Sequence, residues 1–155
     1  MTCHARVGVI SDTHDLLRPE VVERLRGVDL VIHAGDVGSP MILDALASVA
    51  PVQAVRGNTD SRELGLPETR VVELTPSLLV YVIHDLGRLD LDPAAAGMCA
   101  VISGHSHRPQ AERRGGVLYL NPGSAGPRRF SLPVSLALLR VTEGGVEGEI
   151  VVLDV

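Results

Sequence analysis

The chain has 155 residues, enough for one domain that buries about two-thirds of its unfolded surface, and we predict a single domain over residues 1–155. Its formal net charge of −5 argues against extended nucleic-acid binding and anionic-membrane binding, because both need a basic face. Hydrophobic residues make up 45% of the chain but aromatic residues only 2%, which predicts an aliphatic core and argues against a base-stacking platform.

We expect no targeting or membrane-spanning segment in this sequence. The longest apolar run, residues 78–83, is far shorter than the ~20 residues that span a bilayer. A strand-like pattern begins at Val7, which leaves no room for a signal peptide. Cys3 and Cys99 are the only cysteines, and we expect both to be free thiols. These features together predict a cytoplasmic protein.

In the first half of the chain, short β-branched runs alternate with helical patterns. We predict strands at Val7–Ile10, Leu30–Ala34 and Val52–Val55, with helices at Pro19–Leu25 and Met41–Val49 between them. This alternation predicts parallel strands joined by right-handed crossovers.

The second half is richer in strands and has one predicted short helix, near Pro93–Met98. The predicted strands are Val71–Leu74, Leu78–Ile83, Ala100–Ser103, Val117–Leu120, Ser135–Val141 and Val146–Val152. We find no repeat, linker or composition break. The predicted fold class is α/β, with two packed sheets flanked by helices.

Polar side chains follow five of the predicted strands directly. They are Asp12, His14, Asp36, Asn58, His84, His105 and His107. Because the carboxyl ends of strands in an α/β sheet share one edge of the molecule, we expect these residues to converge there. The pairs Asp12/His14 and His105/His107 are each two residues apart, so we expect an extended backbone in which both members face the same way.

The seven side chains have the chemistry of metal ligands. Two carboxylates, one amide oxygen and four imidazoles suit Mn, Fe, Zn, Co or Ni better than Ca or Mg alone. They are too many for one tetrahedral ion, but they fit two ions that share a bridging carboxylate. Gly35, Gly57 and Gly104 each precede a ligand, as expected where the backbone turns tightly at a crowded site. Each cluster taken alone is an ordinary turn motif. The position of all of them directly after strands is what favours a metal site.

Five segments of the chain carry a family resemblance. They are VISDTH at 9–14, VIHAGD at 31–36, VRGNTD at 55–60, SGHSHRP at 103–109 and LNPGS at 120–124. With the lone histidine His84, they resemble the calcineurin-like metallophosphoesterases, and most closely the compact bacterial and archaeal phosphodiesterases of the YfcE type. The resemblance implies a sandwich of two mixed β-sheets with helices outside and a dinuclear metal centre.

The resemblance also assigns the ligands. The first ion would be bound by Asp12, His14, Asp36 and His107. The second would be bound by Asp36, Asn58, His84 and His105, with Asp36 bridging the two. In the family the second-site histidine is normally followed by Gly, whereas Asp85 follows His84 here. This departure predicts a weaker second site, which Asp85→Gly would tighten.

The implied chemistry is phosphoester hydrolysis, with Asp36, Asn58 and His84 as the catalytic residues. Two ions ~3.5–4 Å apart, with Mn expected first, can hold a bridging hydroxide as nucleophile and clamp the phosphoryl oxygens. With Asp12, Asp36 and that hydroxide, the centre has a formal charge of about +1, which a phosphodiester anion neutralises. We therefore expect small phosphodiester substrates.

Two other functions stay open at this point. A phosphomonoesterase acting on nucleotides or phosphoproteins would need an additional cation for the second negative charge. A non-catalytic protein-interaction scaffold is the other, because a retromer subunit shares this fold. A scaffold would be expected to lose ligands, and all seven are present here. The physiological substrate, the native metals and a homo-oligomeric state are left open.

Four residues near the motifs either support the metal site or have an ordinary structural role. Asp60 either orients the site by hydrogen bonds or is a turn residue. Arg56 and Arg108 either meet the substrate phosphate or are solvated. His33 lies within a buried-looking strand, and we expect a packed histidine rather than a ligand.

Overall fold

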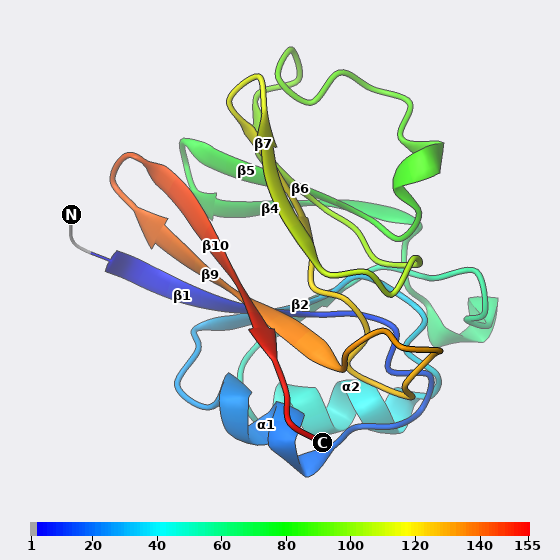
Figure 1. Ribbon diagram of the computed structural model, residues 1–155. Helices are drawn as coiled ribbons and strands as arrows, with labels where there is room; N and C mark the ends of the chain where they lie inside the picture. Colours follow the sequence, from blue (N-terminus) through cyan, green and yellow to red (C-terminus); the bar gives the residue numbers. More distant parts are fainter. Residues whose placement is uncertain (1–2) are drawn as a thin grey trace.

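The computed structural model describes the backbone of residues 3–155 and the side chains from His4 onward (Figure 1). It contains two five-stranded sheets that pack face to face. The bounds of the helices and strands are close to those predicted, and the fold class is confirmed.

The first sheet has the strand order β10-β9-β1-β2-β3. Its strands are β1 (Cys3–Ile10), β2 (Leu30–His33), β3 (Val52–Ala54), β9 (Ser135–Thr142) and β10 (Gly145–Val152). As predicted from the alternation of strands and helices, β1, β2 and β3 are parallel. β9 and β10 add antiparallel strands at one side, so the sheet is mixed.

The second sheet has the order β4-β5-β6-β8-β7. Its strands are β4 (Thr69–Thr75), β5 (Leu78–Ile83), β6 (Met98–Ile102), β7 (Gln110–Arg114) and β8 (Val117–Asn121). β5, β6 and β8 are parallel, while β4 and β7 pair antiparallel at the two edges. This sheet is therefore also mixed.

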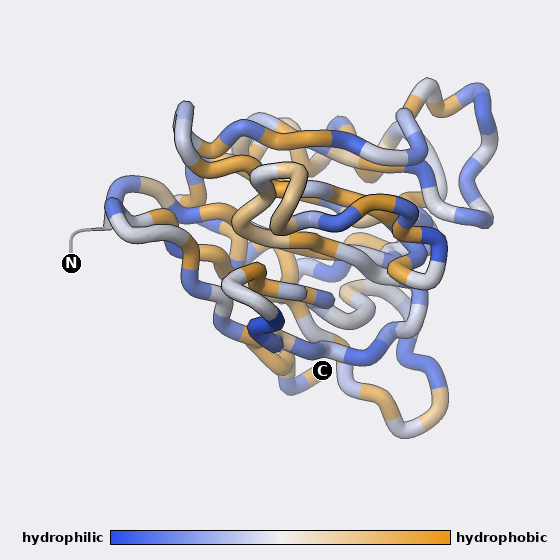
Figure 2. Tube along the Cα trace, turned by 90° about the horizontal axis from the view of Figure 1, so that it is seen from above, coloured by the Kyte–Doolittle hydropathy of each residue, from blue (hydrophilic) through white to orange (hydrophobic). Residues whose placement is uncertain are grey.

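An aliphatic core fills the space between the sheets, with residues such as Val9, Ile32, Val80 and Leu120 almost fully buried. Figure 2 shows hydrophobic residues recurring along the strands, as expected for a core that lies between two sheets.

The two α-helices, α1 (Pro19–Leu25) and α2 (Pro40–Ala47), cover the outer face of the first sheet only (Figure 1). Both begin with Pro in the first turn, where the missing N–H is not needed. The outer face of the second sheet is covered instead by the segment around η2 (Leu86–Arg88), a 3₁₀ helix.

Two details of the predicted elements were wrong. The helix expected near Pro93–Met98 is a set of hydrogen-bonded turns, because Gly97 adopts a left-handed φ of 83° and Met98 already begins β6. β7 was not predicted, because its five residues are all exposed and show no alternation of apolar and polar side chains.

The structure also bears on the cysteines and on membrane-spanning helices. Cys99 carries a free thiol, as predicted, whereas the side chain of Cys3 lies outside the described residues. Among the helices of residues 3–155, we find none with the length and hydrophobicity to cross a membrane.

Candidate metal centre

The structure brings all seven predicted ligand side chains together in the loops that follow β1, β2, β3, β5 and β6. Asp36 lies at the middle of the group. Its Oδ2 atom is 3.6 Å from Nε2 of His14 and 3.2 Å from Nε2 of His84. One carboxylate oxygen is therefore in reach of histidines from both halves of the site.

The first half of the site consists of Asp12, His14 and His107, whose candidate ligand atoms lie within 4.8 Å of one another. Oδ1 of Asp12 is 3.3 Å from Nε2 of His107 and 3.7 Å from Nε2 of His14. Oδ1 of Asp12 and Nε2 of His14 are buried without a hydrogen-bond partner. Unpaired buried polar atoms are costly, and these two fit a bound cation.

The second half of the site is arranged around Asn58. Its Oδ1 atom is 3.0 Å from Nε2 of His84 and 3.1 Å from Nδ1 of His105. Nδ1 of His84 donates to the carbonyl of Ala34 at 2.7 Å, so in the neutral ring the lone pair of Nε2 faces Asn58 and Asp36. Such a hydrogen bond on the far nitrogen is typical of metal-binding histidines.

Both buried carboxylates keep their charge. Burial alone would raise the pKa of Asp36, but its contacts with His84 and the Thr59 N–H outweigh burial and lower it. For Asp12, contacts with His107 and Ser11 likewise outweigh burial and lower the pKa. The pKa of His84 is raised, because the contacts with Asp36 and Asp12 outweigh its burial. In the metal-free protein, a proton on His84 therefore helps to offset the two carboxylates, and metal binding would displace it.

The backbone of the site differs from the extended conformation predicted for the two ligand pairs, and that expectation was wrong. Asp12, His14, His105 and His107 have φ values of 56°, 44°, 71° and 61°. Asp36 also has a positive φ, of 57°. Left-handed conformations are strained for residues other than Gly, and they gather at functional sites. The loops fix one another, since the N–H groups of Asp12 and His14 donate to the carbonyls of Gly35 and Asp36.

The glycines before the ligands are needed for close approach, as predicted. A Cβ atom at Gly57 would lie 2.1 Å from Oδ1 of Asp36, and one at Gly104 would lie 2.0 Å from Oγ of Ser11. Neither space can hold a side chain without moving a ligand loop.

Asp60 links two ligand loops through their backbones. Oδ2 accepts hydrogen bonds from the N–H groups of Val37 and Gly57 at 3.1 and 2.9 Å, and Oδ1 accepts one from Gly38 at 3.1 Å. These bonds hold the backbone next to Asp36 and Asn58. Asp60 therefore supports the site through the backbone and not through the ligand side chains.

His33 is fully buried at the end of β2, and its neutral ring links the loops that follow β1 and β2. Its Nδ1 accepts from the Gly35 N–H at 3.1 Å. Its Nε2 lies 3.0 Å from Oγ1 of Thr13, whose hydroxyl donates to the carbonyl of Val37, so Nε2 is the donor. Burial lowers the pKa of His33 to about 4. These contacts fit the packed histidine that the sequence favoured over a ligand.

This lowered pKa predicts a pH-dependent stability. Because the unfolded chain binds a proton at His33 below about pH 6.5 and the folded chain only below about pH 4, stability falls as the pH drops through this window. Between pH 7 and 4.5 the loss should be about 2–3 kcal/mol. Urea unfolding of His33→Gln should lack this part of the pH dependence, whereas His4→Gln, at an exposed histidine, should retain it. Identical pH dependence in His33→Gln and the unmutated protein would refute the assignment.

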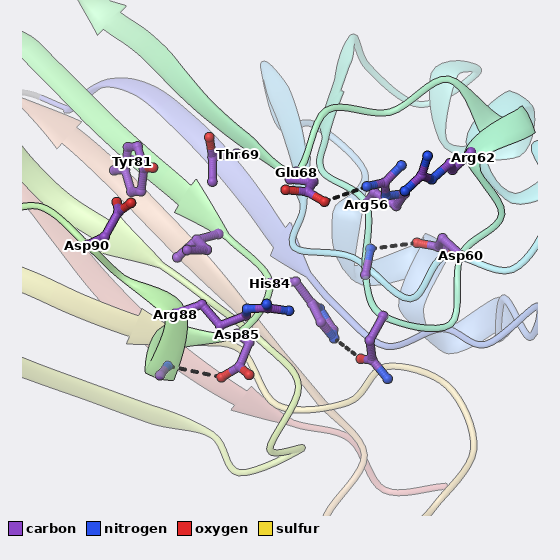
Figure 3. A pocket seen from close by; sticks show the side chains of 14 residues that line it. Arg56, Asp60, Arg62, Glu68, Thr69, Tyr81, His84, Asp85, Arg88 and Asp90 are labelled. Carbon is purple, nitrogen blue, oxygen red and sulfur yellow. Dashed lines mark hydrogen bonds and ion pairs between the residues drawn. The ribbon is translucent and has the colours of Figure 1, made fainter.

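An open cavity of about 940 Å³ borders the second half of the site, with His84 and Asn58 in its wall (Figure 3). Arg62 lies on one side, on the 3₁₀ helix η1 (Arg62–Leu64), and Arg88 lies on the other, on η2. Neither guanidinium has an ion pair within residues 3–155. Their position had no sequence signal, since neither residue belongs to a motif.

Arg56 and Arg108, the arginines considered from the sequence for binding phosphate, are less free to meet a ligand in this cavity than Arg62 and Arg88. Arg56 lines the cavity, but its guanidinium is 2.5 Å from Oε1 of Glu68 and is already paired. Arg108 is exposed and is not among the residues that line this cavity.

A sandwich of two mixed sheets that gathers carboxylates, an amide and histidines at the ends of its strands defines the class of the metallophosphoesterases. Residues 5–144 match the model of the calcineurin-like phosphoesterase superfamily domain, and the chain belongs to this superfamily, as the motifs predicted. Membership implies a phosphoester hydrolase.

Individual relatives agree with this family. A probable metallophosphoesterase from Methanothermobacter thermautotrophicus is 38% identical over 94% of this chain and 91% of its own length. An archaeal phosphodiesterase of known structure is 25% identical, with a TM-score of 0.79 over 96% of this chain and 99% of that one. A single mutant of Vps29 from Entamoeba histolytica is 26% identical, with a TM-score of 0.72 over 96% and 99% of the two chains.

Proposed function

We propose that the protein hydrolyses small phosphodiesters at a dinuclear metal centre. The observation that carries this proposal is the position of Asp36 Oδ2, which lies 3.6 Å from His14 and 3.2 Å from His84. A carboxylate in reach of two separate groups of nitrogen ligands is suited to bridge two ions.

The geometry supports one assignment of the ligands. The first ion takes Asp12, His14, Asp36 and His107, and the second takes Asp36, Asn58, His84 and His105. The unpaired buried atoms of Asp12 and His14 support the first position, and the two histidine nitrogens that converge on Asn58 support the second. These mixed sets of imidazole and oxygen ligands suit Mn, Fe, Zn, Co or Ni, and Mn is our first candidate.

Bound divalent ions would supply Lewis-acid activation of the phosphoryl group and a nucleophile derived from water. The chain contributes the geometry of the site. Asp36 joins the two halves of the site, and Asp60 holds together the loops that carry Asp36 and Asn58. The cavity beside His84 receives the rest of the substrate, with Arg62 and Arg88 on its walls.

A diester fits the charge of the site better than a monoester. Two divalent cations with Asp12, Asp36 and a hydroxide leave about one positive charge, which a diester monoanion neutralises. Similarity to an archaeal phosphodiesterase supports the same preference. A monoesterase is the alternative in which Arg62 and Arg88 neutralise the second phosphate charge.

A protein-interaction scaffold is the second candidate, favoured by the similarity to Vps29. Phe130, the only phenylalanine of the chain, is 90% exposed and could contact a partner. The retained ligand set favours the enzyme over this candidate.

A turnover screen on metal-stripped protein tests the proposal. Each candidate metal is added back separately, and aryl diesters and monoesters are compared as substrates. We expect metal-dependent hydrolysis with higher kcat/KM for diesters. Higher kcat/KM for monoesters would select the alternative substrate class. No turnover with any metal, despite full metal binding, would favour the scaffold.

A further inference from the structure

His105 uses its two ring nitrogens in different directions. Nδ1 lies 3.1 Å from Oδ1 of Asn58, inside the site, whereas Nε2 lies 4.0 Å from Oδ2 of Asp85, outside it. The His105 side chain is 45% exposed, compared with 22% for His14 and 5% for His84. Packing therefore holds His105 less firmly than it holds these two histidines.

A cation bound through Nδ1 of His105 would leave the proton of the neutral ring on Nε2. Without metal, Nδ1 can donate its proton to the amide oxygen of Asn58. If Nδ1 and Asn58 Oδ1 both bind a cation, the proton of the neutral ring must be on Nε2 instead. That N–H then faces the carboxylate of Asp85, a group that favours a proton on Nε2 and offsets the charge that the ring gains from the cation.

Asp85 is itself held in place for this contact. Its Oδ1 accepts a hydrogen bond from the Gly87 N–H at 2.9 Å at the start of η2, so Oδ2 is left to face His105. Asp85 also follows His84 directly, and the rings of His84 and His105 meet edge to face, with centroids 5.2 Å apart. The Nε2–Oδ2 distance of 4.0 Å is longer than a hydrogen bond, so the carboxylate acts on the partly exposed ring through its negative charge.

We propose that Asp85 is a positioning residue that tightens the second metal ion by stabilising the His105 ring with its proton on Nε2. This inference rests on the two-ion assignment proposed above. It reverses the direction expected from the sequence alone, in which Asp85 weakens the second site and Asp85→Gly tightens it.

Metal titration of the stripped protein by calorimetry tests the proposal, with Mn²⁺ as the probe. Asp85→Asn removes the charge but retains an oxygen that can accept from the Gly87 N–H, so η2 should stay formed. Carboxylates behind metal-binding histidines contribute about 10- to 100-fold to metal affinity, and for this partly exposed pair we expect about tenfold weaker binding of one ion. The other ion should bind as before, and Asp85→Glu should restore part of the loss.

Asp92→Asn is the matched control. Asp92 is an exposed aspartate that, like Asp85, accepts a hydrogen bond from a backbone N–H, here that of Ala95, and it is not a proposed ligand. Its two affinities should equal those of the unmutated protein. Unchanged affinities in Asp85→Asn, or tighter binding in Asp85→Gly, would overturn the proposal. Equal weakening of both ions, with a lower melting temperature of the metal-free protein, would show a structural role and overturn it too.

The same titration separates this inference from the proposed function. Two bound equivalents without turnover on any phosphoester would defeat the proposed hydrolysis and leave the role of Asp85 to be decided by the variants. A single equivalent in the unmutated protein would defeat the two-ion assignment and the role of Asp85 together.

Discussion

Asp36→Asn is expected to lower phosphodiester turnover by more than about 100-fold, since even residues behind the ligands contribute about 10- to 100-fold at metal sites. The amide keeps the shape of the side chain but loses the negative charge that lies between His14 and His84. Both ions depend on this carboxylate in the proposed assignment, so the variant should bind less metal in both positions.

Metal content by mass spectrometry and turnover on the same samples check this prediction. Asp44→Asn serves as the matched control, because Asp44 is exposed on α2 and is not among the proposed ligands. The control should retain full metal content and activity. An Asp36→Asn protein with two equivalents of metal and normal turnover would show that Asp36 does not bridge.

The second large effect concerns the leaving group of the substrate. Many larger members of the superfamily carry a histidine directly after the asparagine ligand, placed to protonate the departing oxygen, whereas this chain has Thr59. The backbone N–H of Thr59 donates to Oδ1 of Asp36 at 2.9 Å, but its hydroxyl cannot act as a general acid near neutral pH. Because such a proton donor contributes ~10²–10⁴-fold, its loss should fall on poor leaving groups.

A series of diesters with increasing leaving-group pKa measures this dependence. Log rate should fall steeply as the pKa of the leaving group rises, so aryl diesters react readily and alkyl or nucleoside diesters slowly. Thr59→His should flatten the dependence, whereas Thr59→Asn, which also retains the backbone contact with Asp36, should leave it steep. A flat dependence in the unmutated protein, with chemistry rate-limiting, would mean that another residue supplies the proton.

Much of the fold and the set of candidate ligands could be predicted because the signals are local. Short β-branched runs end at polar clusters, and the carboxyl ends of the strands meet at one edge of the sheets. Asp12 and His107 could therefore be placed together despite their separation in sequence. The glycines before Asp36 and Asn58 pointed to close backbone approach, which the space around Gly57 confirms.

Other features depend on tertiary contacts that no local pattern contains. The left-handed backbone at Asp12 and His105 is held by neighbouring loops, so a rule for extended strands failed there. The position of Asp85 beside His105 depends on the tertiary fold around η2, and no local sequence pattern shows this contact. β7 is an exposed edge strand without a hydrophobic pattern. Only its pairing with β8 defines it.

Anomalous diffraction from a crystal soaked in Mn²⁺ would locate the ions of the proposed dinuclear centre directly. We expect two peaks about 3.5–4 Å apart, with Asp36 between them. One peak should contact His14 and His107, and the other should contact Asn58, His84 and His105. A single peak, or two peaks that do not share Asp36, at saturating Mn²⁺ would contradict the dinuclear centre.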